Sequence, residues 1–437
     1  MARTLDVMKP IDPVKREKAL ALLADTSDSK LRTHLNSCVR CGLCATSCMY
    51  YDTFHEAKYI PAVKVDIVAS IYKRFNTFLG KHAPKLVNAR PLNEETAEEM
   101  VDLLFGSCTM CGRCVAHCSI GVDISYLVHK GREMLAEMGM VPASLQSTVD
   151  AAVQTGNNMA IPVEEYTDTI EWMEEELQDE VEDENARIPL DEQDCNIFYT
   201  LNPREPKFFP LSIKAMAKIF YAAQESWTLS TKYYDVTNYG YFNGNTAEAT
   251  LIARNLHDEV LRLKGKRLIL GECGHGSYAN RWEGPNYLGH SYEFDMITAV
   301  ELMKEYIDSG RIRLDKSLNS EPVTIHDPCN LIRNGGMFNT LRYVLHASCS
   351  NIIEMNPYGN DNHCCGGGGG QLAMSEYNER RLGIGKIKAD QIRKSGATIV
   401  ITPCHNCVDQ LLQLNHTYKL GVKIMTVAEI VANALIL

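Results

Sequence analysis

The cysteines are the residues whose type and spacing point most directly to chemistry. Eight of the 16 cysteines form two quartets with the same C-x-x-C-x-x-C-x-x-x-C spacing. The quartets are Cys38, Cys41, Cys44 and Cys48, and Cys108, Cys111, Cys114 and Cys118. Three thiolates on a tight loop can hold three corners of a 4Fe-4S cubane, and the spaced fourth cysteine points at the other cluster. The two quartets therefore predict two cubane clusters.

The position of the fourth cysteine predicts that the quartets exchange ligands. Cys118 would complete the cluster of Cys38, Cys41 and Cys44, and Cys48 would complete that of Cys108, Cys111 and Cys114. Zinc is a weaker alternative, because zinc sites use pairs of C-x-x-C rather than a repeated quartet. Two neighbouring cubanes would form a path for electrons.

A second constellation of five cysteines lies in the last third of the chain. It consists of Cys329 in HDPCN, Cys364 and Cys365 in HCCGGGGG, and Cys404 and Cys407 in TPCHNC. Adjacent cysteines rarely share one metal ion, but they can bind different irons of a larger cluster when glycines let the backbone fold closely. Gly366 and Gly367 begin a run of five glycines that supplies this freedom. A flexible loop is the alternative for that run.

Histidines near these cysteines are candidate catalytic residues. His326, His363 and His405 each lie within three residues of a cysteine of the five. A histidine there could donate a proton to a leaving thiolate, since its pKa is close to neutral. A plain hydrogen bond to cluster sulfur is the equally favoured alternative.

The sequence GECGHG adds Cys273 and His275 to the candidates. Cys273 occupies the position that Cys404 has in an internal repeat, so folding could bring Cys273 opposite the five-cysteine site. There it could be a substrate thiol or an extra ligand, or simply a small buried side chain. No other cysteine lies at a metal-ligand spacing from Cys195 or Cys349, and we expect both side chains in the core.

The elements that must position these residues differ between the two ends of the chain. Ala62–Phe75 and Glu94–Phe105 have apolar residues at helical spacing, and Asn93 is a suitable N-cap. From Asp194 onward, short apolar runs alternate with helical patterns, with the clearest strands at Arg267–Leu270 and Thr398–Ile401. TIVITPCHNC repeats the layout of RLILGECGHG, which suggests two related α/β halves.

These patterns predict an α+β multidomain protein. The expected parts are an N-terminal segment (1–30), a helical ferredoxin domain with both cubanes (31–145), an acidic linker (146–193), a first α/β half (194–310) and a second half with the five-cysteine site (311–437). Residues 164–184 contain twelve acidic residues among twenty-one, which indicates a solvated linker or helix face, or a docking surface for a basic partner.

Composition excludes several classes of protein. The net charge of −11 provides no basic field for nucleic acid. No charged and then apolar leader begins the chain, so we expect a cytoplasmic protein with free cysteines. No stretch has the 18 or so apolar residues of a membrane helix, so any membrane link is expected to go through partner subunits. The apolar tail 426–437 is expected to pack into the core or to dock on a membrane subunit.

Two regions resemble known domains. Residues 30–140 or so resemble the helical ferredoxin domain of fumarate reductase iron–sulfur subunits and of the heterodisulfide reductase family. Residues 320–410 or so resemble the cysteine-rich CCG domain of heterodisulfide reductases. The resemblance implies that the five cysteines ligate a noncubane 4Fe-4S cluster. The first half departs from this pattern, with Gly240–Gly244 and the lone Cys273 in place of a CCG motif. One noncubane cluster is therefore expected.

The whole chain resembles the D subunit of heterodisulfide reductase, the K subunit of the sulfite-reductase-associated membrane complex (DsrK) and the B subunit of a transmembrane cytochrome c complex. The resemblance implies a cytoplasmic iron–sulfur subunit that passes electrons to or from a disulfide, trisulfide or thiol. The implied partners are a membrane cytochrome b-type subunit on the quinone side, cytochrome c subunits and a small thiol-bearing protein or disulfide. The alternatives are a pure electron relay and the iron–sulfur subunit of a glycolate or glycerol-3-phosphate oxidising complex.

Overall fold

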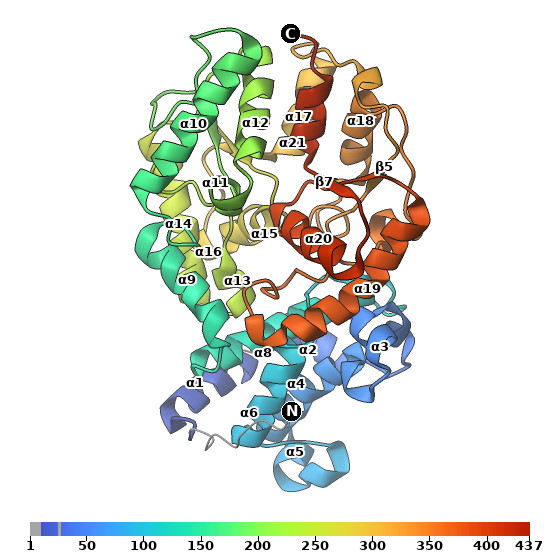
Figure 1. The fold of residues 1–437 in the computed structure, drawn as a ribbon. Helices are drawn as coiled ribbons and strands as arrows, with labels where there is room; N and C mark the ends of the chain where they lie inside the picture. The colour runs from blue at the N-terminus through green and yellow to red at the C-terminus, as the bar shows by residue number, and fades with distance from the viewer. Residues whose placement is uncertain (1–9, 25–27) are drawn as a thin grey trace. The chain divides into compact units, whose positions relative to one another are not determined.

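The computed structural model describes residues 10–24 and 28–437 (Figure 1). The remainder of the expected N-terminal segment lies outside the described residues. The chain divides into two compact units. The first comprises the described residues up to Gln146 together with Tyr241–Thr246 and Gly369–Arg380, and the second comprises the rest. Two short pieces of the later chain thus belong to the unit that carries the quartets, which the sequence did not predict.

The first unit is built around two helices, α4 (Pro61–Asn76) and α8 (Ile124–Glu137), which pack against each other and against α1 (Pro13–Ala24). Proline suits the first turn of α4, where its missing N–H costs no hydrogen bond. A Cβ at Gly131 of α8 would lie 2.3 Å from Leu104 Cδ1, so any other residue there would require the Leu104 side chain to shift. The helical character predicted for this region is confirmed.

Shorter helices complete the first unit. They are α2 (Ser29–Ser37), α3 (Met49–Phe54), α5 (Phe78–His82), α6 (Glu94–Met100) and α7 (Arg113–Ala116). Asn93 caps α6 as predicted, since its side chain accepts a hydrogen bond of 3.1 Å from Thr96 N. The predicted helix Glu94–Phe105 is regular only to Met100 and widens into a π turn at Val101–Phe105.

The second unit contains two parallel sheets. The first has the order β2-β1-β3-β4 and the second β5-β6-β7. Their strands are β1 (Ile197–Tyr199), β2 (Trp227–Thr228), β3 (Arg267–Leu270), β4 (Asp295–Thr298), β5 (Val323–Ile325), β6 (Ile399–Ile401) and β7 (Lys423–Met425). The two strands predicted most clearly from sequence, β3 and β6, are each central in their sheet.

The two halves of this unit repeat one plan. After β3, Cys273 is the N-cap of α15 (Gly274–Tyr278), and after β6, Cys404 is the N-cap of α20 (His405–Tyr418). After β4 and β7 follow α17 (Ala299–Asp308) and α21 (Val427–Ala434), each opened by a Thr-x-x-Glu capping box. The repeat predicted from sequence is therefore present, and it places Cys273 and Cys404 at corresponding carboxyl ends of strands.

Helices cover both faces of the first sheet. The remaining helices are α9 (Ala143–Thr155), α10 (Val163–Val181), α11 (Arg204–Phe208), α12 (Pro210–Ala222), α13 (Tyr239–Asn243), α14 (Thr246–Arg262), α16 (Gly284–Leu288), α18 (Phe338–Ser348) and α19 (Asn378–Ser395). Helices α10, α12, α17, α18 and α21 share a hydrophobic core with both sheets, whereas α14 covers the opposite face of the first.

The acidic stretch is a helix of the second unit and not a linker. Tyr166, Ile170 and Met173 lie on one side of α10 and are buried in the core. Its acidic side chains lie on the other side, where Glu180 is 2.8 Å from Lys218 of α12. The apolar spacing within the acidic run was the signal for this packing.

The apolar tail packs into the core, because α21 belongs to the same cluster as α12 and α18. Within the described ranges, no helix combines the length and the apolar character needed to cross a bilayer.

Candidate metal centres

The two quartet loops share one unusual backbone conformation. The residue before the second cysteine is left-handed in both, with φ of 56° at Arg40 and 52° at Met110. The glycine after that cysteine is left-handed as well, with φ of 81° at Gly42 and 73° at Gly112. Alternation of this kind coils the backbone tightly and turns its N–H groups toward a common centre, a geometry that binds anions and iron–sulfur clusters.

The first candidate metal centre combines three cysteines of one quartet with one of the other. Cys38, Cys41, Cys44 and Cys118 line a single cavity of the first unit. The other lining residues are Val39, Arg40, Gly42, Leu43, Ala62, Ile120, Val122 and Ile124. Four thiols in apolar surroundings without a carboxylate fit an iron–sulfur cluster and not a hard cation such as Mg²⁺.

The second candidate metal centre consists of the remaining four quartet cysteines. Burial raises the pKa of the Cys114 thiol strongly, and negative charge on Cys111, Cys108 and Cys48 would raise it further. These four sulfurs are thus close enough to interact. Thiolates crowded in this way are stable only when bound metal neutralises their charge, so this set also fits a cluster.

Arg132 of α8 is a buried cation beside the second centre. Its side chain is fully buried and donates to the backbone oxygens of Leu104 (2.8 Å) and Cys108 (3.0 Å). It also donates to Phe242 O (2.6 Å) and Gly369 O (2.8 Å), which lie in the two late segments of the first unit. Burial lowers the pKa of Arg132 to about 10, so the guanidinium stays charged at neutral pH. One side chain therefore joins the second quartet loop to both segments.

The five cysteines of the last third line one cavity in the second unit. The structure brings together Cys329, Cys364, Cys365, Cys404 and Cys407. The other lining residues are Gly274, His275, His326, Pro328, Asn330, Gly367, Gly368 and Asn406. None of these side chains is a carboxylate, lysine or arginine, so the donor set fits an iron–sulfur cluster.

Backbone amides stabilise the sulfurs around this cavity. Gly366 N donates to Cys364 Sγ at 3.3 Å, and Gly367 N donates to Cys365 Sγ at 3.4 Å. Gly366 has φ of 102°, a conformation that other residues rarely adopt. The glycine run is therefore an ordered turn whose N–H groups favour the thiolate form needed for ligation.

Cys273 lies next to this cavity but not in its lining. Its thiol is fully buried, and its sulfur accepts hydrogen bonds from Gly276 N (3.3 Å) and Asn202 Nδ2 (3.4 Å). The Cys404 thiol is its neighbour, and burial raises the pKa of Cys273 well above its usual value. The internal repeat thus brings Cys273 beside the five-cysteine set, as a sixth cysteine sulfur.

Two of the predicted histidines face the five-cysteine cavity. His326 is within 4.8 Å of the sulfurs of Cys365 and Cys407, and burial lowers its pKa to about 3. Its ring is therefore neutral at neutral pH. His275 lies against the Cys404 thiol, and its Nδ1 accepts a hydrogen bond of 2.7 Å from Asn406 Nδ2.

His405 and His363 do not line the cavity. His405 Nδ1 lies 3.1 Å from Glu272 O and its Nε2 lies 2.9 Å from Ser212 Oγ, so both ring nitrogens are engaged elsewhere. Successive residues of a helix point about 100° apart, and His405 therefore diverges from Cys404 while Cys407 returns to the same side. His363 is half-buried. The geometry supports no proton donation to the cluster by His405.

Comparison with known proteins agrees with both cysteine-rich regions, that of the two quartets and that of the five cysteines. A family model described as a 4Fe-4S dicluster domain matches residues 34–122, and one described as a cysteine-rich domain, CCG, matches residues 323–412. The chain is 26% identical to the D subunit of the dihydromethanophenazine:CoB–CoM heterodisulfide reductase of Methanosarcina mazei, over 92% of this chain and 94% of the relative. The chain is heterodisulfide reductase D-like.

Other relatives extend this likeness. The Hdr-like menaquinol oxidoreductase iron–sulfur subunit 2 of Archaeoglobus fulgidus is 27% identical over 97% of this chain and 84% of its own length. The EtfAB:quinone oxidoreductase of Syntrophomonas wolfei is 25% identical, and this chain spans 54% of it. The predicted resemblance is confirmed, and the chain is an iron–sulfur protein of an electron-transferring oxidoreductase family.

Sequence reasoning missed a polar network that anchors this heterodisulfide reductase D-like site. Buried Asp327 binds the Arg342 guanidinium through both oxygens at 2.7 and 2.8 Å. Asn362 Nδ2 donates to Asp327 O at 2.8 Å, and Lys388 Nζ donates to Asn362 Oδ1 at 2.5 Å. The network joins the turns before Cys329 and Cys364. Of these network residues, only Asp327 lies in a sequence motif noted above, HDPCN.

Buried Lys388 is the least expected member of that network. Burial lowers its pKa to about 7, while negative charge on Asp327 and the nearby cysteines opposes this effect. The buried face of a helix is normally predicted from its apolar residues, so the sequence around Lys388 did not indicate that this lysine is buried.

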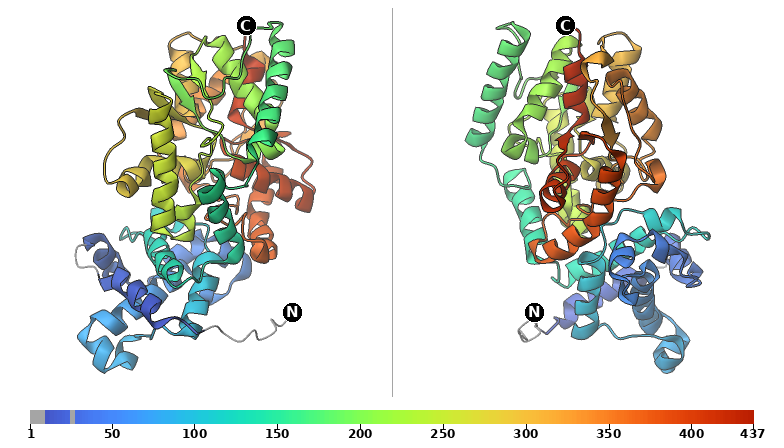
Figure 2. Two further views of the ribbon diagram at one scale, coloured as in Figure 1. Left: turned by 90° about the vertical axis from the view of Figure 1, so that its left-hand side faces the viewer. Right: turned by 45° about the vertical axis from the view of Figure 1, so that its right-hand side comes forward.

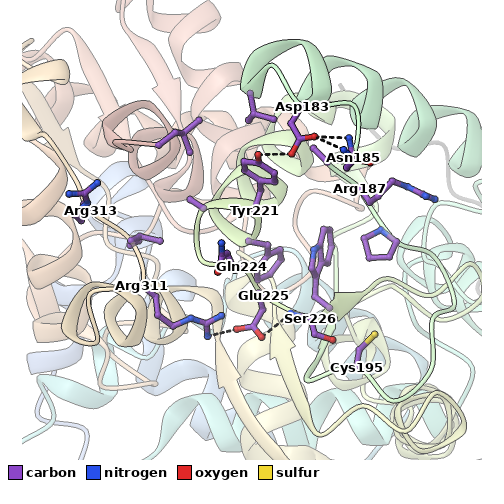
Figure 3. A pocket seen from close by; sticks show the side chains of 18 of the residues that line it. Asp183, Asn185, Arg187, Cys195, Tyr221, Gln224, Glu225, Ser226, Arg311 and Arg313 are labelled. Carbon is purple, nitrogen blue, oxygen red and sulfur yellow. Dashed lines mark hydrogen bonds and ion pairs between the residues drawn. The ribbon is translucent and has the colours of Figure 1, made fainter.

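A cavity of about 840 Å³ elsewhere in the second unit is lined by none of the predicted metal ligands or catalytic residues (Figure 3). It lies before the first residues of β1 and β2, at the ends of the strands opposite to the cysteine turns. Two charges of its lining, Arg311 and Glu225, bind each other 2.7 Å apart, as Figure 3 shows. Cys195 lines it, and burial raises the pKa of its thiol. We therefore assign no chemistry to this cavity.

Proposed function

We propose that the chain is the iron–sulfur subunit of a membrane-associated redox complex. Two cubanes on the quartets would conduct electrons to a noncubane 4Fe-4S site on the five cysteines, which reduces a disulfide or trisulfide or, in reverse, oxidises thiols. The observation that supports this most is the convergence of five thiols from three separate segments on one cavity without charged side chains. The names of two relatives, a menaquinol and a quinone oxidoreductase, support a link to quinone. The proposed partners are a membrane cytochrome b-type subunit on the quinone side and cytochrome c subunits.

Reduction of a disulfide to two thiols takes two electrons and two protons. A cubane passes one electron at a time, so the five-cysteine cluster would supply the capacity to hold the half-reduced state. The chain must supply the protons. His275 is better placed than His326 for this, because Asn406 fixes its ring and the ring lies against the Cys404 thiol. His326 would instead serve as a neutral hydrogen-bonding group.

Electrons are proposed to enter at the first centre. Cys41 is exposed there, and the side chains of Val39, Leu43 and Ile120 around it are 67%, 47% and 50% exposed. An apolar rim around a partly exposed cluster is suited to transient docking of a redox partner. The second centre would then pass the electron on.

A relay without substrate chemistry is the second candidate. Cys364, Cys365, Cys404 and Cys407 are all buried, and Cys329 alone among the five is partly exposed. This burial favours electron transfer over direct attack on a bulky disulfide. Under this alternative, purified complex would reduce no disulfide with any electron donor.

A cysteine substitution distinguishes these functions. We expect Cys364→Ala to abolish the EPR signal that a disulfide or thiol induces in the oxidised protein, while the cubane signals of the reduced protein remain. Cys349→Ala is the matched control, because Cys349 is equally buried in the same unit but lies in the hydrophobic core. A disulfide-dependent signal that survives Cys364→Ala would refute the proposed site, and its absence from the wild type would favour the relay.

A further inference from the structure

The segment 77–88 of the first unit combines positive charge with exposed apolar side chains. Residues 67–93 contain no aspartate or glutamate and five lysines or arginines, in a chain whose net charge is −11. Helix α5 and the short turn at Pro84–Val87 lie within this stretch, at the end of α4 (Figures 1 and 2). Two of these basic residues, Lys81 and Lys85, lie in the segment itself, and no acidic residue of the stretch offsets their charge.

This segment is firmly built onto α4. Thr77 Oγ1 donates to Lys73 O at 2.8 Å and accepts from Gly80 N at 3.0 Å. Arg74 Nη1 donates to Gly80 O at 3.2 Å and to Lys81 O at 3.0 Å. A Cβ at Gly80 would lie 1.8 Å from Lys73 O, so the contact requires glycine. The backbone is thus held in place by α4 itself.

The apolar side chains at the tip are largely exposed, and Phe78 packs on the His82 ring of the same short helix, with the ring centroids 4.7 Å apart. Phe78, Leu79 and Leu86 are 76%, 51% and 82% exposed. Lys81 and Lys85 are exposed beside them, whereas Arg74 and Arg90 are engaged with backbone oxygens and with Glu99. Large apolar side chains on a rigid support, with lysines around them, match the pattern of elements that lie in the interface of an anionic bilayer.

We propose that the segment 77–88 binds directly to an anionic lipid surface, with Phe78 and Leu86 in the interfacial layer and Lys81 and Lys85 on the headgroup phosphates. The charge complementarity favours lipid, because anionic headgroups attract Lys81 and Lys85. The same headgroups repel the remainder of the chain, which is net negative, so only this segment would face the membrane. Ala62 lines the first metal centre and Asn76 ends α4, so the helix spans about 20 Å between that centre and the segment. The inference concerns only this surface and does not depend on the chemistry of the five-cysteine site.

Vesicle co-sedimentation of the full-length, cluster-loaded protein tests the proposal. We expect binding to phosphatidylglycerol vesicles that is at least about tenfold stronger than binding to phosphatidylcholine vesicles and that weakens in high salt. Phe78→Ser with Leu86→Ser, and separately Lys81→Glu with Lys85→Glu, should each reduce binding by about tenfold or more. Leu318→Ser removes a side chain that is 59% exposed in the second unit and is the matched control.

Retention of the visible absorption of the clusters shows that each variant is folded. Failure of the wild type to bind phosphatidylglycerol vesicles free of membrane proteins would overturn the proposal, in favour of docking on a protein. Equal binding by wild type and both double variants would overturn it as well.

Discussion

Replacement of Arg132 by methionine is expected to destabilise the first unit and to release its second cluster. The guanidinium satisfies backbone oxygens of four residues in the interior, including Cys108 O in the second quartet loop. Methionine would leave these oxygens buried without donors, at a cost of about 3 kcal/mol or more. This corresponds to a fall in melting temperature on the order of 8 °C, together with the loss of about four irons per chain.

Two further variants separate the causes of this effect. Arg132→Lys keeps the charge but reaches fewer oxygens, so its loss of iron and of melting temperature should be intermediate. Arg254→Met removes an exposed arginine of α14 and should change neither quantity. If Arg132→Met kept all of its iron and melted with the wild type, Arg132 would not hold the second loop.

The exchange of ligands between the quartets predicts opposite results for two double variants. Cys38 and Cys118 line the same cavity, so Cys38→Ala with Cys118→Ala should damage one cluster and cost about four irons. Cys48 interacts instead with Cys114 of the second centre. Cys38→Ala with Cys48→Ala should therefore damage both clusters and cost about eight irons.

Iron analysis together with EPR of the reduced proteins measures these losses. The reverse pattern, with the greater loss in the variant that lacks Cys38 and Cys118, would show that each quartet holds its own cluster. Cys195→Ala serves as the control, because Cys195 is a buried cysteine outside both centres.

Local spacing explains why so much of the two sites could be predicted from sequence. The quartets, the Cys-Cys-Gly run and the strands β3 and β6 are each defined within about ten residues, where backbone geometry determines which side chains converge. The internal repeat placed Cys273 near Cys404, because two similar strand-to-turn units have similar ends.

Long-range packing explains what the sequence did not indicate. Arg132 and Lys388 are polar residues of helices, and their burial depends on segments far away in the chain. His405 was expected beside the cluster because it adjoins Cys404, but the helix turns its ring toward Ser212. The acidic run suggested a linker because its charges obscure the apolar spacing of Tyr166, Ile170 and Met173.

Determination of iron and acid-labile sulfide in the anaerobically purified protein tests the central claim most directly. The arrangement of the thirteen cysteines predicts about 12 irons per chain, in two cubanes and one further cluster. A value of about 8, with the spectra of cubanes alone, would contradict the third cluster on Cys329, Cys364, Cys365, Cys404 and Cys407.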